Sequence, residues 1–404
     1  MNKLQSVFLE ILGSALKGES APRYADLSEE DWLALAKIAS EQKLLPLFFN
    51  AVYTQAPLQG LRVTVRHQVM LQTMKTEEFL RLYQMWNQAG VYPVVVKGII
   101  CRSLYQKPDH RPSSDEDVLV APDQVSEAKN VLEAFGMSTT ETRDDAYELP
   151  FRQNEGPLYI ELHNHLFDPK SESFGHWNSL FDGVHSRLHQ QEIHGTVIYT
   201  LSPTDHLLFL VCHALKHFIH SGFGLRQICD IVTFANHFGA AVDWNELIQK
   251  CDSISASVFA ATIFQIGEKY FGFDKIKARY PDAWNSLHID DANMLNDLFS
   301  SGIYGSSSVG RVHSSNITLD AVAASKNDKS TKPSVLGSIF PNASKLEGSY
   351  PYLQKYPVLL PLAWTQRIVR YALDVQSGKT EGAAESIKIG NQRVDLLRQY
   401  GVIK

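Results

Sequence analysis

Two aspartates separated by one residue, directly before an apolar run, are the feature that most constrains this chain. Asp115 and Asp117 lead straight into Val-Leu-Val, so residues 115–120 are expected to form a strand that enters a hydrophobic core. Alternate side chains of a strand point to the same face, which places both carboxylates together. Adjacent carboxylates repel each other unless a cation or a proton lies between them. The pair therefore predicts a metal site or, as the alternative, a solvated strand end.

A third acid lies in a later segment that alternates polar and apolar residues. Residues 158–165 read Leu-Tyr-Ile-Glu-Leu-His-Asn-His, which places Glu161, His163 and His165 on one face of a predicted strand. Carboxylates on neighbouring strands are a typical arrangement for Mg²⁺, which bridges nucleotide phosphates and stabilises charge at the phosphorus under attack. The histidines could ligate a metal or shuttle a proton. The alternative is a pair of hydrogen-bonded structural histidines.

Basic residues and a glycine near the acids suggest how phosphates could be held. Lys97 and Gly98 follow the apolar run 94–96. A glycine there lets the backbone approach a phosphate, with the amides of the next helical turn pointing at it; the alternative is a glycine needed only for a tight turn. Arg111 could clamp a phosphate or pair with a carboxylate.

A histidine-rich apolar helix is predicted over residues 203–220, with a proline at its first position. One stripe of this helix carries His206, His213, His217 and His220. His213 and His217 have the i, i+4 spacing of a zinc protease, but no glutamate lies between them. Histidines at a domain interface are therefore favoured over a metal site. Lys216 on this helix and Arg226 beyond it could reach a triphosphate. Asp230, in an apolar stretch, predicts a buried acid with a partner such as Arg226.

The rest of the sequence predicts helices on both sides of a mixed α/β unit. Residues 1–88 are predicted to be helical, 89–200 to form the acid-bearing core, and 201–299 to form a helical domain. Residues 300–404 are predicted to be a linker, rich in Ser, Gly, Asn and Lys up to residue 341, followed by a helical tail. At 404 residues the chain is long for a single core, so several domains are expected.

Composition narrows the range of partners. The net charge of −6 argues against a general nucleic-acid binder but is compatible with a local basic groove. No run approaches the roughly 18 apolar residues of a membrane span, and the N-terminus lacks the apolar core of a signal peptide. The four cysteines are scattered, which predicts reduced, buried thiols instead of disulfides or a zinc site. These features favour a cytoplasmic protein that does not bind membranes.

Blocks of sequence, taken in order, resemble a family of uncharacterised bacterial nucleotidyltransferases in the DNA polymerase beta-like superfamily. The first block contains Lys97-Gly98, Leu104-Tyr105, Arg111-Pro112 and the acid-bearing strand at 115–120. The second is the Ile-Glu-Leu-His run that contains Glu161, and the third is the helical stretch 213–230. Residues 41–52 are similar to the family's N-terminal helical region. The resemblance covers roughly residues 30–240.

The resemblance implies an α+β fold, with a polymerase-beta-like core of a mixed sheet and helices, flanked by N- and C-terminal helical regions. It implies that Asp115, Asp117 and Glu161 bind Mg²⁺ or Mn²⁺. Glu161 would also help to deprotonate the acceptor, with His163 beside it, so that all four residues take part in catalysis.

The resemblance also implies a phosphate site. Gly98 would stand for the glycine of the superfamily's Gly-Ser turn, while Lys97, Arg111 and Lys216 would neutralise phosphate charge. The sequence departs from the superfamily pattern in three ways. No serine follows Gly98, the gap to Asp115 is longer, and a glutamate replaces the third aspartate.

The implied activity is Mg²⁺-dependent transfer of a nucleotidyl group from a nucleoside triphosphate, with ATP as the first candidate. The acidic chain makes a hydroxyl of a small molecule or a protein a better acceptor than nucleic acid. The alternative is a catalytically inactive nucleotide- or partner-binding module with the same fold. The missing serine favours that alternative, and the intact carboxylates argue against it. A metal-dependent hydrolase that uses the histidines is a weaker third hypothesis.

Overall fold

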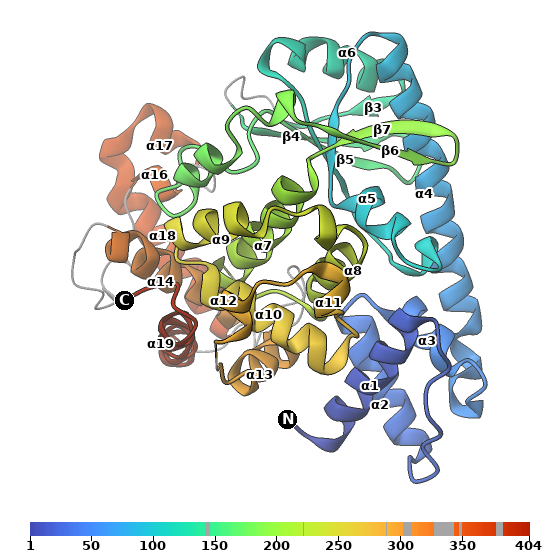
Figure 1. Ribbon diagram of the computed structural model, residues 1–404. Helices are drawn as coiled ribbons and strands as arrows, with labels where there is room; N and C mark the ends of the chain where they lie inside the picture. Colours follow the sequence, from blue (N-terminus) through green and yellow to red (C-terminus); the bar gives the residue numbers. More distant parts are fainter. Residues whose placement is uncertain are drawn as a thin grey trace.

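A mixed β-sheet lies beside a large body of helices in the computed structural model (Figure 1). The structure describes residues 1–141, 146–220, 222–287, 289–301, 309–326, 343–346, 350–376 and 383–404. Within these residues seven strands form one sheet in the order β3-β4-β5-β2-β1-β7-β6. Their bounds are β1 Val94–Val96, β2 Glu116–Leu119, β3 Met137–Ser138, β4 Glu148–Gln153, β5 Tyr159–His163, β6 His189–Ile193 and β7 Thr196–Thr200.

The sheet is mixed because only two of its neighbouring pairs are parallel. Strand β2 runs parallel to β5 and β1 parallel to β7, while the other pairs are antiparallel. Strand β1 is shorter than the apolar run that predicted it, because Pro93 has no amide for the ladder. Strands β6 and β7 form a hairpin that was not predicted. Its turn residues His194 and Gly195 both have positive φ, as in the tight turns that join twisted strands.

The two faces of the sheet have different surroundings. Apolar side chains on one face, including Val95, Val118 and Ile160, form a buried cluster with residues of α4 (Arg62–Gln88) and α6 (Val125–Ala134). Figure 1 shows the long α4 running along the edge of the molecule, from the N-terminal helices to the sheet. Asp117 of β2 and Glu161 of β5 face the other way, towards α7 (Pro203–His220), and line a cavity with residues of that helix. One face of the sheet is therefore covered by helices, while the other lines a cavity.

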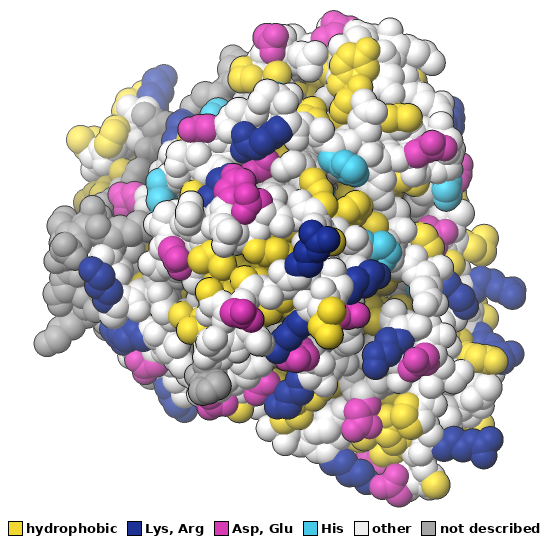
Figure 2. Space-filling view, in the orientation of Figure 1, with side chains coloured by type: hydrophobic (Ala, Val, Ile, Leu, Met, Phe, Trp, Pro, Cys, Tyr) yellow, Lys and Arg dark blue, Asp and Glu magenta, His cyan; other side chains and the backbone are white. Residues whose placement is uncertain are grey.

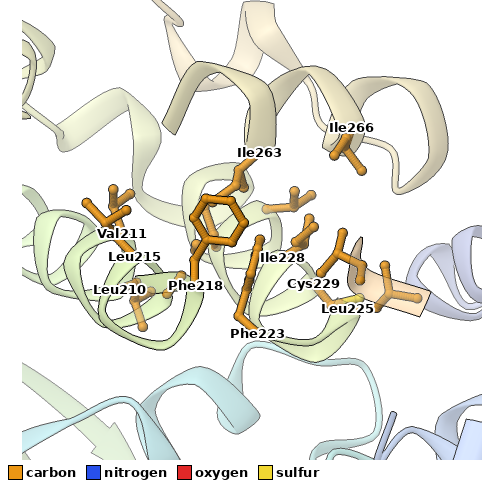
Figure 3. Packing of buried hydrophobic residues seen from close by; sticks show 14 of the residues in the cluster. Leu210, Val211, Leu215, Phe218, Phe223, Leu225, Ile228, Cys229, Ile263 and Ile266 are labelled. Atoms are coloured by element: carbon orange, nitrogen blue, oxygen red, sulfur yellow. The ribbon is translucent and has the colours of Figure 1, made fainter. Parts of the chain in front are cut away.

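The N-terminal helices share a continuous hydrophobic core with the helices that follow the sheet. These helices are α1 Lys3–Lys17, α2 Glu29–Glu41, α3 Leu45–Val52, α8 Leu225–Phe238, α9 Trp244–Ser253 and α10 Ser257–Tyr270. In Figure 3, Phe218, Phe223 and Ile263 point into the same buried space. The ring of Phe218 lies 5.8 Å from that of Phe223 and 5.2 Å from that of Phe259. Burial of each such ring contributes about 1.5–3 kcal/mol, so α7, which closes the cleft, rests on a rigid support.

Local sequence signals explain the helix ends. Ser28 caps α2: its hydroxyl accepts a hydrogen bond from the Asp31 amide, and the Asp31 carboxylate accepts one from the Ser28 amide. The remaining described helices are α5 Gly98–Ser103, α11 Lys275–Ala278, α12 Asp282–Asn285, α13 Ala292–Ser301, α14 Val309–Lys326, α16 Ala343–Leu346, α17 Tyr352–Lys355, α18 Leu360–Gln376 and α19 Ala383–Gln399. All four cysteines are free and buried, as predicted. Among the described helices, none combines the length and the apolar character needed to span a bilayer.

The prediction of a linker over residues 300–341 is wrong for its middle part, where helix α14 packs against α7 and α19. The small residues that suggested a loop allow close packing instead, because Ser314 and Thr318 are buried. Thr318 donates a hydrogen bond to the Ile219 carbonyl, and Arg393 of α19 donates one to the Phe218 carbonyl. Both contacts satisfy carbonyls at the end of α7 that have no partner within the helix. Residues 302–308 and 327–342 of the predicted linker lie outside the described residues.

Candidate active site

The register of β2 and β5 gathers three of the predicted site residues. Asp117 lies opposite Glu161 in this parallel pair, and His163 is two residues further along β5. One ligand atom from each side chain lies within 4.8 Å of the others. His163 Nε2 is 3.3 Å from Asp117 Oδ1 and 3.8 Å from Glu161 Oε2. We call Asp117, Glu161 and His163 the acidic cluster. Of the residues predicted to share its face, His165 lies outside β5, is exposed, and contacts Asn164.

Asp115 lies just before β2 and is linked to the acidic cluster through Lys97. Lys97 Nζ is 2.8 Å from Asp117 Oδ2 and 3.7 Å from Asp115 Oδ2. The ammonium group therefore lies between the two aspartates, where the sequence predicted a cation or a proton. Of the predicted metal-binding trio, Asp117 and Glu161 belong to the acidic cluster, and Asp115 is joined to it through Lys97.

Charges in the site offset the effect of burial on pKa. Burial raises the pKa of the Asp117 carboxyl, but the Lys97 ammonium and His163 outweigh it and hold that pKa below its usual range. Burial lowers the pKa of His163, but the close Asp117 and Glu161 carboxylates prevail and raise it to about 9. Burial is also the main reason why the pKa of Glu161 is raised. Without a metal, Lys97 and protonated His163 therefore balance the acids.

The acidic cluster fits a divalent cation. Asp117 and His163 are buried, with 4% and 7% of their surface exposed. Asp117 Oδ2 is paired with Lys97 Nζ at 2.8 Å, but neither ring nitrogen of His163 makes a well-aligned hydrogen bond. Buried polar atoms nearly always have a partner, so the ring nitrogens of His163 point to a ligand. Carboxylates suit Mg²⁺ and Mn²⁺, and the imidazole adds a ligand that Mn²⁺ accepts more readily.

Backbone amides of the turn that was predicted to bind a phosphate donate to protein groups instead. Lys97 and Gly98 have positive φ values of 51° and 39°. The Lys97 amide donates to His206 Nε2 at 3.2 Å, and the Ile99 amide donates to Glu116 Oε2 at 2.7 Å. The Glu116 carboxylate thus takes the place at the start of α5 that a phosphate was expected to take. This arrangement agrees with the alternative in which Gly98 serves a tight turn.

Adding a side chain at Gly98 is expected to destabilise the fold. A Cβ there would lie 1.9 Å from Glu116 Oε2, and the positive φ disfavours any L-residue. Strain together with loss of the charged hydrogen bond should make Gly98→Ala about 3 kcal/mol less stable in urea unfolding. Gly136→Ala is the matched control, because Gly136 also has positive φ but its Cβ would meet nothing within 4 Å. Equal losses in the two variants would contradict this account.

Arg111 pairs with a carboxylate, which was one of its two predicted roles. Its Nε donates to Asp230 Oδ1 at 3.0 Å, and its Nη2 donates to the other oxygen of the same carboxylate. Tyr105 donates its hydroxyl hydrogen to Asp230 Oδ1 at 2.8 Å. Arg226, the predicted partner of Asp230, instead donates to the Pro112 carbonyl at 2.7 Å. The predicted Arg226–Asp230 pair is wrong because Arg226, one turn earlier in α8, points at the loop that precedes β2.

Helix α7 supplies the wall opposite the acids. His213 Nε2 lies 3.1 Å from Lys97 Nζ and 3.1 Å from His217 Nε2. Burial lowers the pKa of His213 and of Lys216, and it lowers that of His217 to about 3. Both histidines are therefore neutral, and in the described part of the chain the metal-ligand group takes no member from α7. His206 packs on the Phe234 ring at 4.7 Å and has a structural role.

Two adjoining cavities meet at the site, and they share Lys97, Ser114, Asp115, His213 and His217. We call the first the basic cavity; its wall also includes Gly98, Arg111, Arg226 and Lys43. We call the second the acidic cavity; its wall also includes the acidic cluster, Lys216, Tyr147, Tyr159, Glu148 and Asp168. Lys43 was missed from the sequence, since a single lysine after a helix is too common to be a signal.

The comparison with protein-family models supplies the family. Residues 28–272 match a family described as uncharacterised nucleotidyltransferase. The chain belongs to this nucleotidyltransferase family. The match spans α2 to α10, so it includes the sheet, the acidic cluster and both cavities. The family predicted from the sequence is confirmed, as is the α+β class with a mixed sheet and flanking helices.

Two solved structures are among the similar proteins. One is the solution structure of the antibiotic-resistance factor ANT(2'')-Ia, with 12% identity and a TM-score of 0.32, covering 48% of this chain and 99% of that one. The other is an antigenic nucleotidyltransferase-like protein from Paracoccidioides brasiliensis, with 14% identity and a TM-score of 0.31, covering 52% of this chain and 96% of that one. A search of curated proteins found no match.

Proposed function

We propose that this member of the family is a Mg²⁺- or Mn²⁺-dependent enzyme that transfers a nucleotidyl group from a nucleoside triphosphate to an acceptor hydroxyl. ATP is the first candidate donor. The observation that carries the proposal is the convergence of Asp117, Glu161 and His163 on one face of the sheet, with Asp115 beside them. Nucleotidyl transfer is the activity that the family description names. Free, buried cysteines support a cytoplasmic location.

The site residues would have the following roles. Asp117, Glu161 and Asp115 would hold the divalent cation, which when bound would offset charge on the phosphates. Lys97 would leave the two aspartates and turn to the phosphates, which also carry negative charge. Glu161 would also take the proton of the acceptor hydroxyl, because it borders the cavity where that hydroxyl is proposed to bind. His163, 3.8 Å from Glu161, would add an imidazole ligand to the same cation.

The acidic cavity is the proposed position of the acceptor. Glu161 borders this cavity and not the basic one, so a hydroxyl bound there would reach the base. Tyr147 and Tyr159 offer ring faces for an organic acceptor. On the face shown in Figure 2, Lys and Arg are interspersed with Asp and Glu. Together with the net charge of −6, this distribution favours a small molecule or a protein over nucleic acid as the acceptor.

Removal of the metal is expected to abolish the activity. The purified protein should release pyrophosphate from labelled nucleoside triphosphates in the presence of Mg²⁺ and a cell lysate that supplies acceptors. EDTA should stop this release, and an excess of Mg²⁺ or Mn²⁺ should restore it, because the charge on the phosphates needs a counter-charge. If pyrophosphate is not released and Mg²⁺-dependent nucleotide binding is not detected, the proposal is wrong.

The second candidate is a non-catalytic module that binds a nucleotide or a partner. The specific observation in its favour is the turn at Lys97 and Gly98, whose amides are engaged by His206 and Glu116. This candidate predicts that nucleotide binds without release of pyrophosphate in the same assay.

A further inference from the structure

The basic cavity contains more positive charge than the protein neutralises. Four cationic side chains line it, and two of these have carboxylate partners: Arg111 is paired with Asp230, and Lys97 with Asp117 and Asp115. The other two are Lys43, between α2 and α3, and Arg226, in α8. Among the described residues, no carboxylate lies within ion-pair distance of either one.

Burial and a neighbouring cation disfavour the charge of both Lys43 and Arg226. Burial lowers the pKa of Lys43 and the Arg226 guanidinium lowers it further, while Asp115 only partly compensates. Burial also lowers the pKa of Arg226, with Arg111 as the next cause. The hydrogen-bond partner of Arg226 is a neutral carbonyl, that of Pro112. Cations held together in this way are stabilised by an anion that binds between them.

The loop that contains Ser113 and Ser114, beside these cations, is held in place by α4. Lys75 of α4 donates to the carbonyls of Ser113 and Ser114 at 3.0 and 3.2 Å. The Ser113 amide donates to Gln72 Oε1 at 2.8 Å. Both serines line the basic cavity, next to Asp115. The cavity therefore has a fixed wall that joins it to the aspartates.

We propose that Lys43 and Arg226 form a polyphosphate subsite that holds the β- and γ-phosphates of the donor and the departing pyrophosphate. This inference rests on the proposed function and specifies its donor side. The subsite is built from two helical regions and not from the turn of the sheet, where Glu116 already caps α5. The α-phosphate would then lie near Asp115, where the basic and acidic cavities meet. Both residues lie within the part of the chain that matches the family.

The first test uses inorganic pyrophosphate as the probe, with binding to the full chain measured by calorimetry in the presence and absence of Mg²⁺. Wild-type protein should bind pyrophosphate, and Lys43→Ala and Arg226→Gln should each bind it about tenfold more weakly. Arg226→Lys should recover part of the loss because it keeps the charge. The matched control is Lys37→Ala on α2, whose side chain is 77% exposed and which should bind like wild type. Thermal unfolding verifies that each variant is folded.

The second test separates this inference from the proposed function. In the transfer assay, Lys43→Ala should raise the KM for ATP by about tenfold and leave kcat within a few-fold of wild type. If pyrophosphate binds and depends on both residues but no transfer occurs, the subsite stands and the proposed function fails. If transfer occurs and the two variants match Lys37→Ala in both assays, the function stands and the subsite is wrong. Failure of the wild-type protein to bind pyrophosphate would also overturn the proposed subsite.

Discussion

Replacement of Asp117 by asparagine is expected to lower the rate of metal-dependent nucleotidyl transfer by about 10³-fold or more. The amide keeps the shape of the side chain but removes its charge. Asp117 lies next to Lys97, Glu161 and His163, so its carboxylate is the centre of the proposed metal site. Loss of one metal-binding carboxylate removes several kcal/mol of charge stabilisation, and each 1.36 kcal/mol corresponds to about tenfold in rate.

The matched control for this variant is Asp123→Asn, which makes the same chemical change at an exposed position shortly after β2. It should retain wild-type activity. A second readout is binding of Mn²⁺, followed by the loss of the free-ion signal in electron paramagnetic resonance. Asp117→Asn should bind Mn²⁺ more weakly even without nucleotide. If Asp117→Asn, or Asp115→Ala combined with Asp117→Ala, keeps most of the activity, the acidic cluster is not the catalytic site.

The parts of the fold that sequence could predict are those fixed by local periodicity. The two-residue alternation of β5 placed Glu161 and His163 on one face, and the pairing of β5 with β2 brought them to Asp117. The Ser28 cap and the proline at the start of α7 set helix ends in the same local way. The hairpin of β6 and β7 was missed because polar residues fill β6 and obscure its alternation. Helix α14 was missed because a serine-rich helix that packs closely resembles a loop in composition.

The parts of the site that sequence could not predict depend on contacts between distant segments. Arg111 and Asp230 are 119 residues apart, and only the packing of α8 against the loop before β2 decides that they meet. The same packing turns Arg226 towards the basic cavity, away from the acid one turn along its helix. Lys43 reaches that cavity from the N-terminal helical region. Glu116, on the opposite face of the strand from the two aspartates, was not considered, although it decides how the Gly98 turn is used.

The ion pair of Arg111 and Asp230 is expected to be a main support of the wall between α8 and the sheet. Their side chains are 4% and 5% exposed, and Asp230 also accepts the Tyr105 hydroxyl. Asp230→Ala would leave a buried guanidinium without a carboxylate. We therefore expect it to lower the free energy of unfolding by about 3–5 kcal/mol, measured by urea unfolding. Asp395→Ala removes an exposed partner of Arg398, with 74% of its side chain in solvent, and should cost under about 1 kcal/mol.

A double variant distinguishes an uncompensated charge from simple loss of packing. Arg111→Met with Asp230→Leu removes both charges and keeps much of the buried volume. Because an apolar pair needs no compensating charge, the double variant should be more stable than Asp230→Ala. If Asp230→Ala instead costs no more than Asp395→Ala, the pair does not support the site. Then the positive charge of Arg111 would be free to act on phosphates, the other role that the sequence allowed for it.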